Sequence, residues 1–422
     1  MSPESIQKGG ARAWLVWSLA AAAFGYAFFQ RVAPGAMVDD LMREFAIGGA
    51  VLGTLSALYF YPYVLLQVPL GALLDQVGAR MLMTVALSTA AVGSVVFGLS
   101  ESLALAYLGR VLIGIGSAVG FLGSLAIAGR WFPPERFTFL AGLAMFVAML
   151  SGMVGGTPLA LFVGDYGWRA SMIASGAIGG FLALLIFLLV RDSPSGHTAP
   201  RRSASSVWRD VGQGLWRTAK LWRVWRTALI AGAMSGPMLT IAGLWGTPYL
   251  MAAYGLGRAE AAGLVSLLLL GWAFGAPFWG WLSDRINKRI ELLRWTTAGL
   301  SLCLALICFV PDLPLWATVS ALVTTGVLGA AMPICFSHAR LVSPNDISGS
   351  VTGVVNSFTV LAGAILQPVV GLVLDLRWDG TLENAARVYQ ASDYRAGFMF
   401  ILGSALMGFV LSLRLHERYA EN

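Results

Sequence analysis

Apolar segments of about twenty residues recur along this chain, and they constrain its fold more than any other feature. Such a segment can cross a hydrocarbon core of about 30 Å as a helix. Because a membrane interior has no water to bind backbone N–H and C=O groups, the segments must be helical. The sequence predicts an all-α membrane protein whose twelve spans cover about residues 14–37, 48–70, 81–99, 104–127, 138–162, 170–190, 227–250, 261–282, 292–310, 315–337, 348–374 and 396–414.

Composition agrees with a membrane protein. Of the 422 residues, 57% are hydrophobic and 12% are charged, whereas soluble domains carry about 25% charged residues. The net charge is +7, and eight of the Lys and Arg residues lie between residues 191 and 226. Because cationic loops stay on the cytoplasmic side, this distribution predicts that both termini and the 191–226 segment are cytoplasmic. Topology accounts for the charge, so we expect no nucleic-acid partner.

Two similar loops, each between a pair of spans, indicate that the chain consists of two related halves. In each loop a Gly is followed four residues later by an Asp, then by a turn residue and cations. They read Gly71-Ala-Leu-Leu-Asp75-Gln-Val-Gly78-Ala-Arg80 and Gly280-Trp-Leu-Ser-Asp284-Arg285-Ile-Asn287-Lys288-Arg289. We therefore expect an N-terminal tail (1–13), a six-helix bundle (14–190), a cytoplasmic linker (191–226), a second six-helix bundle (227–414) and a C-terminal tail (415–422).

The linker combines cations with Trp208, Trp216 and Trp222. This combination is typical of an amphipathic helix that lies on an anionic membrane surface, and a solvated connector is the alternative. Elsewhere the three histidines are scattered, and the three cysteines lack the spacing of zinc ligands or of a disulfide framework. We expect no enzymatic activity, no metal and no cofactor.

The motifs and their order resemble the major facilitator superfamily over essentially the whole chain, in particular its bacterial organic-anion branches. The two loops are similar to the signature that follows its second and eighth spans, and Arg110-Val-Leu-Ile-Gly114-Ile-Gly116 is similar to its fourth-span signature. An antiporter signature at the end of span five is broken, because Thr157 occupies its proline position and Pro158 comes one residue late.

The resemblance implies two six-helix bundles that rock against each other, with the solute bound between them near mid-membrane. It also implies a multi-pass protein of the bacterial cytoplasmic membrane. We expect a monomer in the lipid bilayer that handles a small-molecule solute, with a proton or Na⁺ as the coupling ion. No Asp or Glu falls in the middle of a predicted span, so a facilitator without a coupling ion is also open.

Arg31 and Arg110 are the cations within predicted spans. An arginine at membrane depth is costly unless it pairs or faces water, so each is a candidate ligand for an anionic solute. The resemblance supports this for Arg31, since first-span arginines contact anionic substrates in related branches. The alternatives are that Arg31 extends to the outer interface, near Asp39 or Asp40, and that Arg110 makes a structural contact with carbonyl groups.

Other polar and aromatic side chains are candidates for the same cavity. Tyr59, Tyr63 and Gln67 share one face of span two, because they are spaced by four residues. Trp245, Asn356 and Gln367 are counterparts in the second half. For all six the alternative is packing between helices.

The duplicated loops predict a cytoplasmic gate. A carboxylate at such a position can accept hydrogen bonds from the free amides of a neighbouring helix N-terminus or pair with a cation. The candidate gate residues are Gly71, Asp75, Gly78, Arg80, Asp284, Arg285 and Arg289.

The sequence thus favours alternating-access transport of a small polar solute, with an organic anion as the first hypothesis. Export of amphipathic compounds, dipeptide transport and a non-transporting membrane receptor of the same fold remain the alternatives.

Overall fold

The computed structural model describes residues 10–193, 204–286, 288–344 and 347–415. The described part is almost entirely helical. Eleven of its helical segments are long and apolar enough to cross a membrane. One of these, Pro134–Leu189, contains both the fifth and the sixth predicted spans, which accounts for the difference from twelve. The predicted all-α architecture is confirmed.

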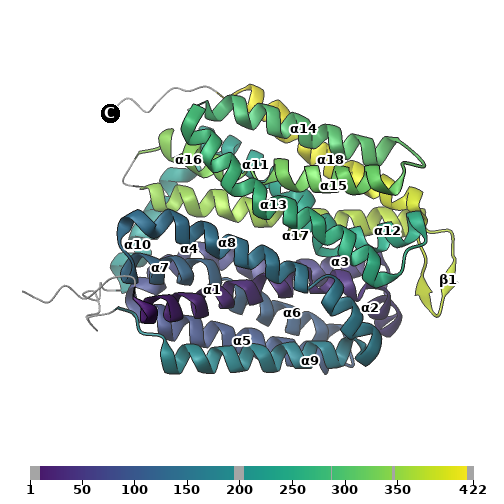
Figure 1. The fold of residues 1–422 in the computed structure, drawn as a ribbon, viewed down its shortest axis with the longest axis horizontal. Coiled ribbons are helices and arrows are strands. Elements are labelled where there is room, and N and C mark those ends of the chain that lie inside the picture. Colours follow the sequence, from purple (N-terminus) through teal and green to yellow (C-terminus); the bar gives the residue numbers. More distant parts are fainter. Residues whose placement is uncertain (1–9, 194–203, 287, 345–346, 416–422) are drawn as a thin grey trace, which may run out of the picture.

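The N-terminal half packs as one bundle of nearly parallel helices (Figure 1). Its elements are α1 (Ala11–Val32), η1 (Ala33–Ala36), α2 (Val38–Phe45), α3 (Gly49–Ala57), α4 (Phe60–Val77), α5 (Ala79–Gly98), α6 (Leu103–Ser117), α7 (Gly120–Trp131), η2 (Pro134–Arg136), α8 (Phe137–Val154) and α9 (Thr157–Leu189).

The C-terminal half forms a second bundle above the first in that view. Its elements are α11 (Trp222–Pro237), η3 (Met238–Trp245), α12 (Gly246–Tyr254), α13 (Arg258–Ile286), α14 (Arg289–Phe309), α15 (Leu315–Gly329), α16 (Pro333–Leu341), α17 (Ser348–Arg377), β1 (Leu382–Glu383), β2 (Ala386–Arg387) and α18 (Ala391–Leu413).

Several predicted spans are pairs of helices rather than single rods. Span two is divided into α3 and α4 at Leu58–Tyr59, and span ten is divided before Pro333. Proline lacks the N–H that a helix needs and clashes with the preceding turn, so breaks gather near prolines. Spans five and six meet at Gly167, within the predicted connection between residues 162 and 170. Its φ of 82° is non-helical, so α9 comprises two helices that join at a kink.

The helix α10 (Ala204–Ala219) follows the N-terminal half and lies at one end of the bundle (Figure 1). It packs on α4 and α17, which belong to different halves. Gly214 faces Ser350 of α17, and the indole of Trp216 is exposed. The amphipathic character expected for the linker is present in this helix, and its contact with lipid stays a prediction. We call this the linker end of the molecule.

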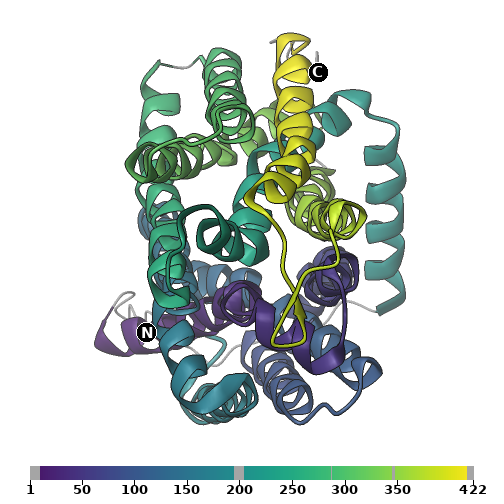
Figure 2. The same cartoon turned by 90° about the vertical axis from the view of Figure 1, so that its right-hand side faces the viewer.

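A two-stranded hairpin marks the opposite end, which we call the hairpin end. Leu382 pairs with Arg387 and Glu383 with Ala386. The two loop residues, Asn384 and Ala385, both have positive φ, which is the requirement of a type I′ hairpin turn. The sequence did not predict this hairpin, since Ala385 is not a typical residue at such a position. Figure 2 shows the molecule from this end, with the hairpin reaching from the C-terminal half across helices of the N-terminal half.

Small residues bring helices into close contact within each bundle. A Cβ atom at Gly109 would lie 2.9 Å from the carbonyl oxygen of Gly93, on the neighbouring helix α5. A Cβ at Gly120 would lie 2.9 Å from the Cα of Phe24 on α1. In a membrane, where apolar burial gives no drive for helix association, such contacts supply dispersion energy over long helix faces.

Candidate functional site

Arg31 lies in the last turn of α1, with 5% of its surface exposed. Its guanidinium carbon lies 4.3 Å from the ring centroid of Phe28 and 5.2 Å from that of Tyr63. The rings of Tyr59 and Phe60, on the neighbouring segment, lie within 5.8 Å. The cation is thus enclosed by aromatic faces, whose negative quadrupole attracts it. We call these four rings the aromatic cage.

Two donors of Arg31, Nε and Nη2, are buried and have no hydrogen-bond partner. In the part of the chain that the structure describes, no carboxylate pairs with this guanidinium. Asp40, which the sequence suggested as a partner, is instead engaged by Arg43 and Arg258, each at 2.6 Å. A buried charge with unsatisfied donors costs free energy in this conformation.

Arg110 is also buried, but each nitrogen of its guanidinium donates to a backbone carbonyl. It donates to the carbonyl oxygens of Gln30 at 3.0 Å, Ser56 at 3.1 Å and Leu55 at 3.4 Å. These carbonyls are available because Pro34 offers no N–H to Gln30, and because α3 ends at Ala57. Arg110 therefore stabilises two helix breaks, which is the structural alternative considered from the sequence. Its role as a substrate ligand stays a prediction.

The wall opposite the aromatic cage comes from the C-terminal half. A π-helical segment, η3, contacts η1, and π-turns are frequent at functional sites. A Cβ at Gly243 of η3 would lie 3.0 Å from the amide nitrogen of Gln367 and 3.9 Å from the carbonyl oxygen of Arg31. A Cβ at Gly363 of α17 would lie 3.4 Å from the ring of Phe60. The two halves meet at this level.

The predicted second-half residues Trp245 and Gln367 lie together in this wall. The Trp245 indole donates to the carbonyl oxygen of Gln367 at 2.9 Å. The Gln367 amide in turn donates to the carbonyl oxygen of Leu239 at 2.8 Å, while its own oxygen Oε1 has no partner. Both side chains are fully buried and keep the π-helical segment against α17.

Gln67 and Asn356, also predicted, form a contact between the halves. The Asn356 amide donates to Oε1 of Gln67 at 2.9 Å, and the Gln67 amide donates to the carbonyl oxygen of Ala118. Asn356 precedes Gln367 on α17 by about 16 Å at 1.5 Å per residue. This pair therefore lies between the aromatic cage and the linker end.

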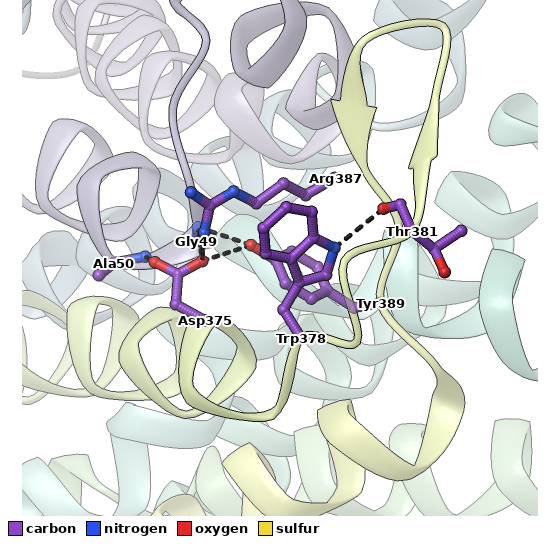
Figure 3. A network of polar contacts seen from close by, with 7 residues as sticks. All are labelled: Gly49, Ala50, Asp375, Trp378, Thr381, Arg387 and Tyr389. Carbon is purple, nitrogen blue, oxygen red and sulfur yellow. Dashed lines mark hydrogen bonds and ion pairs between the residues drawn. The ribbon is translucent and has the colours of Figure 1, made fainter.

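At the hairpin end, Asp375 joins the two halves (Figure 3). Its carboxylate accepts hydrogen bonds from the amides of Gly49 at 2.8 Å and Ala50 at 2.9 Å, at the N-terminus of α3. Arg387 and Tyr389, from its own half, donate to it as well. Burial and then the bond to Asp375 raise the pKa of Tyr389, so its hydroxyl keeps the proton that it donates. We call this group the hairpin-end latch.

Further contacts between the halves lie near the hairpin-end latch. Arg258 of α13 donates to Asp40 of α2 at 2.6 Å. Thr157 of α9 donates to the carbonyl oxygen of Ala259 at 3.0 Å. Gln367 precedes Asp375 by about 12 Å along α17. On the face formed by α3, α4 and α17, the aromatic cage is therefore bracketed by the hairpin-end latch and the Gln67–Asn356 pair.

The first predicted gate loop is held within its own half. The backbone amide of Arg80 donates to Asp192 at 2.9 Å, and its guanidinium donates to the carbonyl oxygen of Phe187 at 2.8 Å. Arg130 lies 3.7 Å from the same carboxylate. Gly78, with a φ of 89°, lets the chain turn beside Asp192. The side chain of Asp75 and the burial of Gly71 lie outside the described part.

In the second loop, Asp284 and Arg285 are exposed, and Arg285 lies over the ring of Trp281. The Nε of Arg289 is buried without a partner. Among the described side chains of the two loops, no hydrogen bond or ion pair reaches the other half. The cytoplasmic gate stays a prediction.

Sequence reasoning did not predict the capping role of the two carboxylates that organise the ends. Asp192 follows α9 and accepts the amide of Arg80 at the start of α5. Asp375 lies near the end of α17 and accepts the amide of Gly49 at the start of α3. Position at a span end was visible in the sequence, but the helix that each one caps was not.

Comparison with known proteins identifies the family. The model of the Major Facilitator Superfamily matches residues 19–368 and 238–422. The chain belongs to this superfamily. In a Major Facilitator protein the two bundles are repeats, and the solute site lies between them. The chain is an integral, multi-pass membrane protein, and its family and relatives are transporters rather than enzymes.

Two curated relatives of this Major Facilitator chain are named for sulfoacetate and for nitrate/nitrite. It is 25% identical to the probable sulfoacetate transporter SauU of Cupriavidus necator, over 64% of each chain. It is 24% identical to the probable nitrate/nitrite transporter NarK2 of Mycobacterium tuberculosis, over 91% of each chain. In the matches to the uncharacterized transporter YybO of Bacillus subtilis and to SauU, the aligned part spans 45% and 64% of the relative's length.

A solved structure shows the same fold. The bacterial homologue of the human lysosomal transporter Spinster, in an inward-facing and occupied conformation, superimposes with a TM-score of 0.76. The match covers 95% of this chain and 97% of that one, at 18% identity. The predicted fold class is confirmed by this likeness and by the family match.

Proposed function

We propose that this protein is a secondary transporter that moves a small organic anion by alternating access, with Arg31 as the anion ligand. The observation that carries the proposal is the buried guanidinium with two free donors, which pairs with no carboxylate among the described residues. An arginine in a membrane interior is retained where it meets a counter-ion or a water-filled path. A solute anion that arrives from one side and leaves on the other supplies that counter-ion transiently.

The position of Arg31 between the halves supports alternating access. The hairpin-end latch and the Arg258–Asp40 pair both join opposite halves. Opening of the hairpin end must break them, and closure restores them. The linker end, where the predicted cytoplasmic gate lies, would then close in the alternate state. The coupling ion and the monomeric state remain predictions.

Relatives named for sulfoacetate and for nitrate support an anionic solute. They do not choose between the two chemistries, since nitrate carries one negative charge and sulfoacetate carries two. The aromatic cage also keeps the amphipathic-compound alternative of interest, because it offers apolar surface beside the cation. The aromatic cage thus favours an anion with an apolar part.

Counterflow in liposomes tests the proposal. Purified protein would be reconstituted with benzoate or nitrate inside, and uptake of the labelled anion would be measured for the wild type and for Arg31→Gln. We expect uptake by the wild type and its loss in the variant, while Arg209→Gln, on the exposed face of α10, transports normally. Normal uptake by Arg31→Gln would refute the role of Arg31. Ligand binding without any flux would instead favour a receptor.

A further inference from the structure

The free donors of Arg31 form one bidentate fork. Nε and Nη2 are neighbours whose N–H bonds run parallel, and they match two oxygens of a carboxylate, sulfonate or nitrate group. The guanidinium plane is covered by the ring of Phe28, 4.3 Å from its carbon. The site therefore offers one edge-on position for one anionic group.

A second anionic group would find no cationic donor beside it. Arg110, which shares the ring of Tyr59 with Arg31, uses its guanidinium on the carbonyls of Gln30, Leu55 and Ser56. The amides of Gln67 and Gln367 donate to carbonyl oxygens as well. Of the two described cations at the aromatic cage, only Arg31 thus has free buried donors, and nearby free hydroxyls, such as those of Ser56 and Thr240, are neutral.

The remaining surface of the site is apolar. Phe28, Phe60 and Tyr63 surround the guanidinium on the N-terminal side. Leu239 and Gly363 face Phe60 from the C-terminal half. Apolar walls stabilise the body of an organic anion, and they penalise an additional unpaired charge because its hydration is lost without compensation.

We propose that the site selects monoanions that join one carboxylate-type group to an apolar body, and that it discriminates against dianions. The charged group occupies the Arg31 fork, and the apolar body lies among the rings of the aromatic cage. This inference rests on the proposed function, and it specifies the class of substrate that the same site binds. Contact of the body with Phe60, which touches α17, lets the bound anion bridge the two halves.

Matched probes test charge and apolarity separately. Benzoate and phthalate share one ring and carry one and two carboxylates, while nitrate is a monoanion without an apolar body. Binding would be measured as ligand-induced thermal stabilisation of purified protein, and transport as counterflow in liposomes, at a pH where both phthalate carboxylates are ionised. We expect benzoate to bind about a hundredfold more tightly than phthalate, since the second charge stays unpaired in the site.

Variants separate the two parts of the site. Phe60→Ala should weaken benzoate about tenfold while leaving nitrate unchanged, because only benzoate uses the ring surface. Phe400→Ala, at an exposed position of α18, serves as the matched control and should change neither. Arg31→Gln should abolish binding of both monoanions.

The outcomes distinguish this inference from the proposed function. Equal binding of phthalate and benzoate, lost in Arg31→Gln, would overturn the charge selectivity and leave Arg31 as the anion ligand. Equal benzoate affinity in Phe60→Ala and the wild type would overturn the role of the aromatic cage. Absence of binding and counterflow for every probe in the wild type would overturn both proposals.

Discussion

The carboxylate of Asp375 caps the N-terminus of helix α3 in the opposite half, with the amide nitrogen of Gly49 at 2.8 Å. Asp192 accepts the amide of Arg80 in a similar way, but both of those residues belong to the N-terminal half. A carboxylate at a helix N-terminus gains from free amides and from the positive end of the helix dipole. The same chemistry therefore makes one permanent contact and one that must separate when the hairpin end opens.

Asp375→Asn should shift the protein toward opening at the hairpin end. Asparagine keeps one acceptor but presents an NH₂ group to the second amide of α3, and it removes the charge. Loss of such charge-assisted bonds costs about 2 kcal/mol, or about thirtyfold in the equilibrium. The change can be followed as the distance distribution between spin labels at Leu99 and Asp312, which lie in opposite halves at this end.

Asp393→Asn is the matched control for that variant. Asp393 forms a capping box with Gln390 and pairs with Arg377, all within the C-terminal half. Its loss should lower stability without changing the distance between the labels. If Asp375→Asn gives the same distances as the wild type, the hairpin-end latch does not control this end.

Gly371→Ala should also shift the protein toward opening at the hairpin end, in this case for a steric reason. A Cβ atom at Gly371 would overlap the backbone of Gly49, on the other half, which cannot move aside as a flexible side chain does. Overpacking of this kind costs about 1–3 kcal/mol, and here it is relieved by separation of the halves. Gly403→Ala in α18, where nothing lies within 4 Å, is the control. Unchanged label distances in Gly371→Ala would contradict the close approach.

Arg110→Gln and Arg31→Gln should differ in their effect on stability. Removal of the Arg110 guanidinium leaves carbonyl oxygens at two helix breaks without donors, which costs about 1–3 kcal/mol for each such group. Removal of the Arg31 guanidinium takes away a buried charge whose free donors are already unpaired. We expect thermal unfolding in detergent to shift markedly downward for Arg110→Gln and little, or upward, for Arg31→Gln. The reverse order would show that Arg31 holds the fold.

The Gln67–Asn356 pair should show a measurable coupling energy. Polar pairs within membrane proteins contribute about 0.6 kcal/mol on average and up to about 1.7 kcal/mol in double-mutant cycles. We expect a coupling in this range for Gln67→Ala and Asn356→Ala, measured by unfolding. A cycle of Gln67→Ala with Ser235→Ala, whose hydroxyl bonds within the C-terminal half, should be additive. Additivity in both cycles would mean that the observed hydrogen bond contributes nothing.

Prediction from sequence succeeded where the signal is local. The length and apolarity of the segments predicted the spans, and the repeated loops predicted two halves, because both depend on residues close together in the chain. Breaks within spans, such as Leu58–Tyr59, were missed, since a prolonged apolar run conceals a change of helix axis. The hairpin was missed because its turn uses Ala385 at positive φ.

The candidate site was predicted as a set of residue types rather than as a geometry. Arg31, Tyr59 and Tyr63 were each proposed from polarity at membrane depth, and the structure brings them together. From the sequence, Arg31 and Arg110 were equally good candidates for an anion ligand. They differ in the structure because Arg110 meets carbonyls that two helix breaks set free, while two donors of Arg31 face none.

By itself, then, the sequence determined that this chain is a helical membrane protein of two related halves, with arginines at membrane depth. The lengths of the hydrophobic segments and the repeated motifs are local properties of the chain, so they can be recognised without knowledge of any tertiary contact. Only the tertiary structure decided which of those charges are satisfied and which contacts join the halves. Gly49 and Asp375 are separated by 326 positions, and their meeting depends on how each helix is rotated and placed in the bundle. That arrangement follows from packing over the whole molecule, which no local pattern specifies.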